Sequence, residues 1–137
     1  MTSDVPANGL TYSPPAPRRA AWSPPEMLLE LTGIQGDLIA ELIQAFTADV
    51  ALRLEQIRGA VTQADIAMLR YEVHAIKGSS KQMAADRVAF VCEQIEAAGE
   101  ERPISQLVDL VRQLEVRFRE VCEAMAWYQR TNCRGTR

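Results

Sequence analysis

The feature that most constrains the fold is a run of apolar residues near the C-terminus, spaced alternately four and three positions apart. Residues at these spacings lie on one face of an α-helix, so the run predicts a long helix with a continuous apolar stripe. Such a stripe is stable only when other helices cover it along its length. Its members are Leu107, Val111, Leu114, Phe118, Val121, Met125 and Tyr128.

Three earlier segments show the same helical period, and none shows the strict alternation of a β-strand. We expect helices that begin at a capping Asp37, near Asp65, at about Asp86 and at Pro103. The first is predicted to fray over residues 59–63, and the third to end at Gly99. An apolar turn over 27–31 predicts one short helix before them. The predicted fold is all-α, an antiparallel up-down four-helix bundle with a short extra N-terminal helix.

Proline divides the chain into two parts, because six of its seven prolines lie within the first 25 residues. Each proline removes a backbone donor and disfavours helix in the residue before it. We therefore predict a disordered leader over 1–25, the helical bundle over 26–131 and a flexible tail over 132–137. A docking role for the leader stays open through Arg18, Arg19 and Trp22.

Composition excludes several classes of function. One histidine cannot form a His-rich zinc site, and Cys92, Cys122 and Cys133 lack the spacing of a metal-ligand set. A net charge of -3 argues against a general nucleic-acid binder, and no apolar run approaches the roughly 20 residues of a membrane span. The N-terminus lacks the basic-then-apolar order of a signal peptide, and the odd number of cysteines fits a reducing compartment. We expect a cytoplasmic domain with no bound metal.

The single histidine, His74, is predicted to lie on the outer face of the helix that begins near Asp65. At roughly 100° per residue, it points about 130° away from the centre of the apolar arc of this helix. Its neighbours on the same face are Arg70, Lys77, Gly78 and Lys81. This row of cations, which contains no carboxylate, disfavours a charged imidazole and attracts an anion.

Gly78 is unusual because glycine inside a helix costs about 1 kcal/mol relative to alanine. One turn from His74, its missing side chain clears space beside the ring for another protein surface. Two plainer interpretations stay open, in which the basic row is a solvated face and Gly78 permits close helix packing. An exposed imidazole, a nearby lysine and the open space left by Gly78 for another protein together favour phosphoryl acceptance by His74.

The segment from His74 to Ser80, His-Ala-Ile-Lys-Gly-Ser-Ser, resembles the H-x-x-K-G-[SA]-[SA] signature of histidine-containing phosphotransfer (Hpt) domains. The upstream stretch from Leu42 through Phe46 to Asp49 resembles the hydrophobic, Phe and acidic pattern of that family. On the following helix, its L…C..LE pattern is matched by Val88, Cys92, Ile95 and Glu96. The resemblance covers roughly residues 26–125.

This resemblance implies roles for individual residues. His74 is the expected phosphoacceptor, through Nε2, and Lys77 is expected to neutralise the phosphoryl oxygens. Gly78 leaves room for the partner, and Glu96 is expected to hold the other ring nitrogen as N–H, although an ordinary surface role for Glu96 stays open. From the helical row itself, the cations Arg70 and Lys81 are expected to support the site. Ser79 is also a supporting residue, and Ser79 and Ser80 are interpreted as small packing residues rather than nucleophiles.

The resemblance also implies a relay function. The chain is expected to pass a phosphoryl group between aspartates of receiver domains, as a carrier with no cofactor of its own rather than as a complete enzyme. Expected partners are response-regulator receiver domains, which supply Mg²⁺, and a hybrid histidine kinase. We expect a monomer that binds neither nucleic acid nor membrane. Tyr71 and Ala75 are candidates for its docking surface, and a place for Tyr71 at the boundary of the core stays open.

Two positions depart from the family pattern. The glycine that usually follows the motif, where the helix ends, is replaced by Ala84 and Ala85, which predicts that the helix runs further. Lys81 stands where a small residue is common, and its charge is expected to influence partner choice.

The sequence also bears on three functions other than a relay. A non-catalytic helical adaptor that binds a receiver or kinase without phosphotransfer is the main alternative. A histidine-kinase dimerisation domain is disfavoured, because no nucleotide-binding segment follows and Ala75 stands where an acidic residue is usual. Membrane-surface binding is disfavoured by the acidic balance and by the absence of a basic amphipathic helix.

Overall fold

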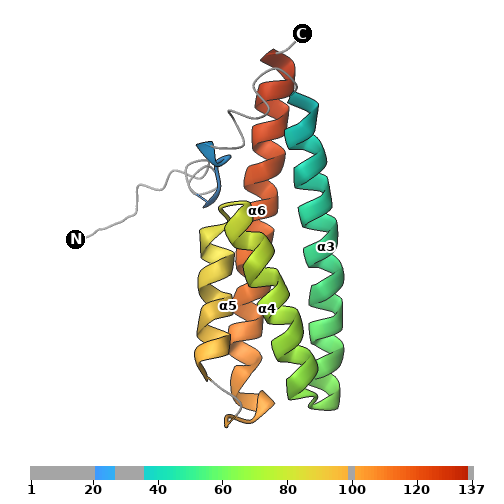
Figure 1. Cartoon of the computed structure of the whole chain (residues 1–137), viewed down its shortest axis with the longest axis vertical. Coiled ribbons are helices and arrows are strands. Elements are labelled where there is room, and N and C mark those ends of the chain that lie inside the picture. The colour runs from blue at the N-terminus through green and yellow to red at the C-terminus, as the bar shows by residue number, and fades with distance from the viewer. Residues whose placement is uncertain (1–20, 27–35, 99–100, 136–137) are drawn as a thin grey trace, which may run out of the picture.

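The structure is a computed structural model, and it describes residues 21–26, 36–98 and 101–135. Its long elements are α3 (Gly36–Gln63), α4 (Ile66–Gln82), α5 (Asp86–Ala98) and α6 (Val108–Gly135), with the 3-10 helix η1 (Ile104–Leu107) before α6. No β-strand occurs in these ranges. The chain runs alternately up and down, and α4 and α5 cover one end of the longer α3 and α6 (Figure 1). Helix α4 packs on α3 and α5, and α6 packs on α5 and α3, so the predicted antiparallel four-helix bundle is confirmed.

The apolar stripe predicted for the last helix lies in the core. Its members from Leu107 to Met125 are buried, and Tyr128 packs on the core at its edge. Phe118 meets Phe46 of α3 edge-on, with ring centroids 6.2 Å apart. The apolar residues that recur every three or four positions in this helix are therefore core residues.

The ends of α4 are defined by short-range hydrogen bonds. At its start, the Asp65 carboxylate accepts a bond from the Met68 N–H (3.1 Å), as expected of an N-cap. At its end, Ala84 adopts a left-handed conformation (φ 58°), and the Ala85 N–H donates to the Ser80 carbonyl (2.8 Å). The expectation that this helix runs further is wrong, because Ala84 takes the left-handed turn for which a glycine is usual.

Three other helix boundaries differ from the prediction. Helix α3 begins one residue before Asp37 and stays regular over 59–63, where Ala60 is buried. Pro103 precedes η1, so the α-helical part of the last element begins only at Val108. Helix α6 continues to Gly135, and residues 132–135, predicted as tail, are helical.

The predicted leader of 25 residues is too long, because its last part packs on the bundle. Ala21 and Trp22 are buried in the core, and the Trp22 indole N–H donates to the Met83 carbonyl (2.7 Å). The Trp22 ring also meets the Tyr128 ring edge-on, with centroids 5.7 Å apart. A buried indole needs such a hydrogen-bond acceptor, and the carbonyl at the end of α4 supplies it. Residues 1–20 and the short helix predicted over 27–31 lie outside the described residues.

Among the helices that the structure describes, none has both the length and the apolar character needed to cross a membrane.

Replacing Ala84 by Gly is expected to stabilise the protein by up to about 1 kcal/mol, because the left-handed conformation costs a non-glycine residue about 1–2 kcal/mol and glycine loses more entropy on folding. Ala48→Gly, at an exposed site inside α3, is the matched control and is expected to destabilise by about 0.5–1 kcal/mol. Urea denaturation measures both changes. Equal destabilisation by the two substitutions would show that Ala84 is not strained.

Candidate functional site

His74 lies in the middle of α4, on the face turned away from the core. Its side chain is 73% exposed, whereas Leu69, Val73 and Ile76 on the opposite face are fully buried. The helical phase of this segment therefore placed the histidine correctly. An exposed imidazole on a rigid helix is accessible to a partner protein without any rearrangement of the bundle.

One ring nitrogen of His74 is held by the neighbouring helix. His74 Nδ1 lies 2.8 Å from Oε2 of Glu96 on α5. A carboxylate accepts hydrogen bonds, so this contact assigns the ring proton to Nδ1 and leaves the lone pair on Nε2. The arrangement fixes both the tautomer and the direction of the ring.

The other oxygen of Glu96 holds Lys77. Lys77 Nζ donates to Glu96 Oε1 at 2.6 Å, so one carboxylate bridges the histidine and the lysine of α4. This hydrogen bond raises the pKa of Lys77 above its ordinary value, against a smaller opposing effect of burial. Burial alone would raise the pKa of Glu96, but the hydrogen bonds and charges of Lys77 and His74 outweigh it and hold the pKa below its ordinary value. Lys77 and Glu96 are therefore both charged near neutral pH.

A second ion pair lies one turn further along the same two helices. Lys81 Nζ is 2.9 Å from Glu93 Oε2, and both side chains are about half exposed. The sequence predicted a row of cations without a carboxylate, which holds for α4 alone. In the bundle, α5 places Glu93 and Glu96 against that row, so the surface beside His74 carries both signs of charge. Glu96 was expected there from the family resemblance, whereas Glu93 was not. Arg70, the remaining cation of the row, is half-buried.

Gly78 stands on the exposed surface one turn from His74. A Cβ atom added there would have nothing within 4 Å. The interpretation that this glycine permits close helix packing is therefore wrong, because none of the helices that the structure describes approaches it. Its small size leaves an open surface beside the ring.

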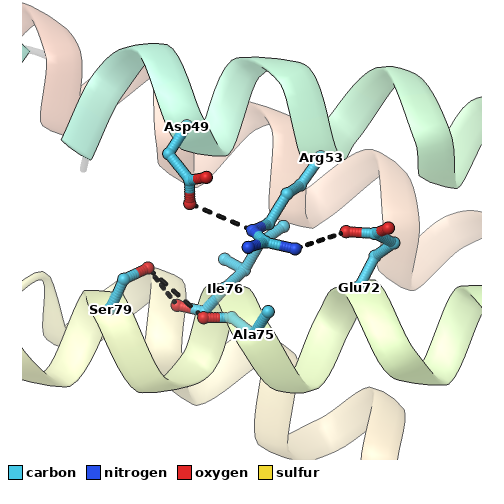
Figure 2. A network of polar contacts seen from close by, with 6 residues as sticks. All are labelled: Asp49, Arg53, Glu72, Ala75, Ile76 and Ser79. Atoms are coloured by element: carbon cyan, nitrogen blue, oxygen red, sulfur yellow. Dashed lines mark hydrogen bonds and ion pairs between the residues drawn. The ribbon is translucent and has the colours of Figure 1, made fainter. Parts of the chain in front are cut away.

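The two serines of the motif do not form a nucleophile. Ser79 Oγ donates to carbonyls of its own helix, at 3.3 Å to Ala75 and 3.2 Å to Ile76 (Figure 2). Ser80 is fully buried against the core. The two hydroxyls are turned away from the open surface beside His74, as expected for small packing residues.

An ion-pair network that no sequence pattern had predicted joins α3 to α4 behind the site. Arg53 of α3 donates to Asp49 (3.0 Å) and to Glu72 of α4 (2.9 Å), as Figure 2 shows. Glu72 is buried and stands two residues before His74. The available signal was the helical phase of Glu72, which stands three residues after Leu69 and four before Ile76, at the edge of the apolar arc. The network is a polar connection between α3 and α4 on the side of α4 opposite Lys77.

Exposed apolar residues lie on the same two helices as this network. Tyr71 of α4 is 68% exposed and Leu52 of α3 is 58% exposed, while Ala75 is half-buried. Tyr71 stands three residues before His74 on α4, so exposed apolar area adjoins the imidazole on the same helix, as is typical of a protein-binding surface. The arrangement offers an accessible imidazole together with a surface on which a partner protein can dock.

Thiol and metal chemistry find little support at the site. Burial raises the pKa of the Cys92 thiol to about 12 and that of Cys122 to about 11, so neither forms a thiolate readily. In the described part of the chain, no three His, Cys, Asp or Glu side chains lie together as a metal site requires.

Comparisons with known proteins agree on one family. The family model described as "Hpt domain" matches residues 41–126. A solved structure, the HPT domain of an Hpt sensor hybrid histidine kinase from Shewanella, is similar with a TM-score of 0.63 and 20% sequence identity; the match covers 77% of this chain and 92% of that chain. A search of curated protein sequences found no significant match.

Glu96→Gln is expected to lower the stability of the protein at neutral pH but not in acid. Because the pKa of Glu96 is lowered by folding, its stabilisation is present above its ordinary value of 4.5 and disappears as the pH falls through the lowered value. The raised pKa of Lys77 sets the upper end of the pH range in which the Lys77–Glu96 pair stabilises the fold. The contribution of Lys77 is present below pH 10.5 and is lost as the pH rises through the raised value.

Urea denaturation of the wild type and of Glu96→Gln from pH 3 to pH 8 measures this difference. Asp109→Asn is the control, because its ion pair with Arg112 is almost fully exposed and contributes little. A stability difference that stays constant down to pH 3 would contradict a bridging carboxylate.

Proposed function

This chain belongs to the Hpt domain family, and from that we propose that it relays a phosphoryl group between receiver-domain aspartates through His74. Hpt domains carry phosphohistidine in phosphorelays. The observation that supports the proposal most is the contact of His74 Nδ1 with Glu96 (2.8 Å) on an otherwise exposed ring. It leaves Nε2 as the free nucleophile within the family motif.

The proposed transfer begins at the lone pair of His74 Nε2. It attacks the phosphorus of an aspartyl phosphate, the N–P bond forms, and the acyl P–O bond breaks to release the receiver's carboxylate. The ring keeps its proton on Nδ1 and becomes positively charged. The carboxylate of Glu96, 2.8 Å from that proton, stabilises the charge. The reverse sequence delivers the phosphoryl group to the aspartate of the second receiver.

Lys77 supplies positive charge beside the ring. Its ammonium is held 2.6 Å from Glu96, on the same carboxylate that holds His74, so it is close to the phosphoryl group without blocking Nε2. Partial neutralisation of the phosphoryl oxygens is the contribution expected of such a cation. Mg²⁺ is expected in the acidic pocket of the receiver, and the chain acts as a carrier with no cofactor of its own.

The proposed partners dock on the surface around His74. Gly78 leaves open space beside the ring, and Tyr71 and Leu52 offer exposed apolar area. We propose receiver domains of a response regulator and of a hybrid histidine kinase as the partners, with the chain working as a monomer in the cytoplasm, where such relays operate.

His74→Gln is expected to abolish acid-labile labelling of the protein by a phosphorylated receiver domain. Because the side chain is exposed, the variant should keep the helical content and stability of the wild type. Incubation with a receiver carrying a radioactive phosphoryl group measures the transfer. Label that persists in His74→Gln would overturn the proposal, and retention of partner-dependent signalling without label would favour a non-catalytic adaptor.

Substitutions of Gly78 are expected to separate stability from transfer. Gly78→Ala and Gly59→Ala should each stabilise the protein by about 1 kcal/mol, because both glycines are exposed within helices and a Cβ at either site meets nothing within 4 Å. Gly78→Arg should slow transfer by at least about tenfold by obstructing the receiver, whereas Gly59→Arg, near the far end of α3, should leave it unchanged. Initial transfer rates and thermal denaturation measure these effects. Equal slowing by the two arginine variants would contradict a specific docking role for Gly78.

A further inference from the structure

Two ion pairs join α4 to α5 beside His74, one helical turn apart. Lys77 pairs with Glu96 (2.6 Å), and one helical turn further Lys81 pairs with Glu93 (2.9 Å). Because α4 and α5 are antiparallel, the second pair lies further from His74 along the same face. Lys81 departs from the small residue that is common at its position.

The two pairs differ in exposure. Lys77 and Glu96 are 22% and 21% exposed, and both oxygens of Glu96 are engaged. Lys81 and Glu93 are 56% and 46% exposed. An exposed pair contributes little to stability, so the outer pair opens readily, whereas Lys77 is held in place. Lysine side chains on a helix extend toward its N-terminus, which directs Lys81 toward the His74 end of the face.

We infer that Lys81 is a second cationic contact for the receiver domain, and that Glu93 restrains it until the receiver binds. This inference rests on the proposed function and adds a determinant of partner choice to it. A receiver that binds Mg²⁺ next to its phosphoacceptor aspartate carries several carboxylates there, so the surface that meets His74 is acidic. An acidic side chain on its rim competes with Glu93 for the Lys81 ammonium. Receivers with a negative rim are therefore favoured over receivers with a neutral or positive one.

Lys81→Met is expected to lower kcat/KM for transfer from a phosphorylated receiver by about two- to fivefold. The change should appear in KM rather than in the rate at saturating receiver, because Lys81 does not touch the reacting atoms. The difference in kcat/KM between Lys81→Met and the wild type should become smaller at high salt, since charges at the rim of an interface are screened. Glu93→Gln should raise kcat/KM by a similar factor, because it frees the lysine.

The double variant tests whether Glu93 acts through Lys81. In the Lys81→Met background, Glu93→Gln should have almost no effect, whereas an undiminished effect would show that Glu93 acts on the receiver directly and would overturn the restraint. Arg112→Met is the matched control, because Arg112 belongs to an exposed ion pair on α6 and should not influence transfer.

The outcomes separate this inference from the proposed function. Wild-type protein that acquires no label from any receiver domain of its host contradicts the proposed function itself. If the wild-type protein is labelled, and Lys81→Met has the same kcat/KM as the wild type at low salt for every receiver, only the role of Lys81 is overturned. A loss confined to receivers with acidic residues at the rim supports the inference.

Discussion

The site depends on one carboxylate that joins two helices. Glu96 of α5 accepts a hydrogen bond from His74 at one oxygen and from Lys77 at the other, at 2.8 and 2.6 Å. The first contact fixes the tautomer, and the second keeps a cation beside the ring. Neither residue of α4 is positioned in this way by its own helix, so the motif on α4 is chemically complete only when α5 packs against it.

The rest of the bundle holds these two helices in register. The left-handed turn at Ala84 reverses the chain within three residues, so that α5 runs back along α4 and brings Glu96 to the level of His74. Arg53 ties Glu72 of α4 to α3 through a 2.9 Å hydrogen bond. Trp22 closes the end of α4 by donating to the Met83 carbonyl. Together these contacts join α4 to its neighbours, with His74 on its exposed face.

Helical spacing predicted the parts of the structure that depend on a single helix. The stripe from Leu107 to Met125 is buried, and the phase of α4 correctly placed His74 outside the core. Features that depend on two distant segments were harder to predict. Trp22 binds a carbonyl 61 residues away, and a leader rich in proline carries no periodic signal for that contact. The carboxylates opposite the cationic row belong to α5, so the row on α4 gave no indication of them. The family resemblance supplied Glu96, and no pattern supplied Glu93.

The central claim is that Glu96 holds Nδ1 of His74 so that Nε2 is the phosphoacceptor. Long-range ¹H–¹⁵N NMR of the imidazole tests it most directly, because the chain contains one histidine and its ring signals need no assignment. The account predicts that the proton resides on Nδ1 in the free protein and that phosphorus couples to Nε2 after transfer. A free ring protonated mainly on Nε2, or a phosphoryl group attached to Nδ1, would contradict it.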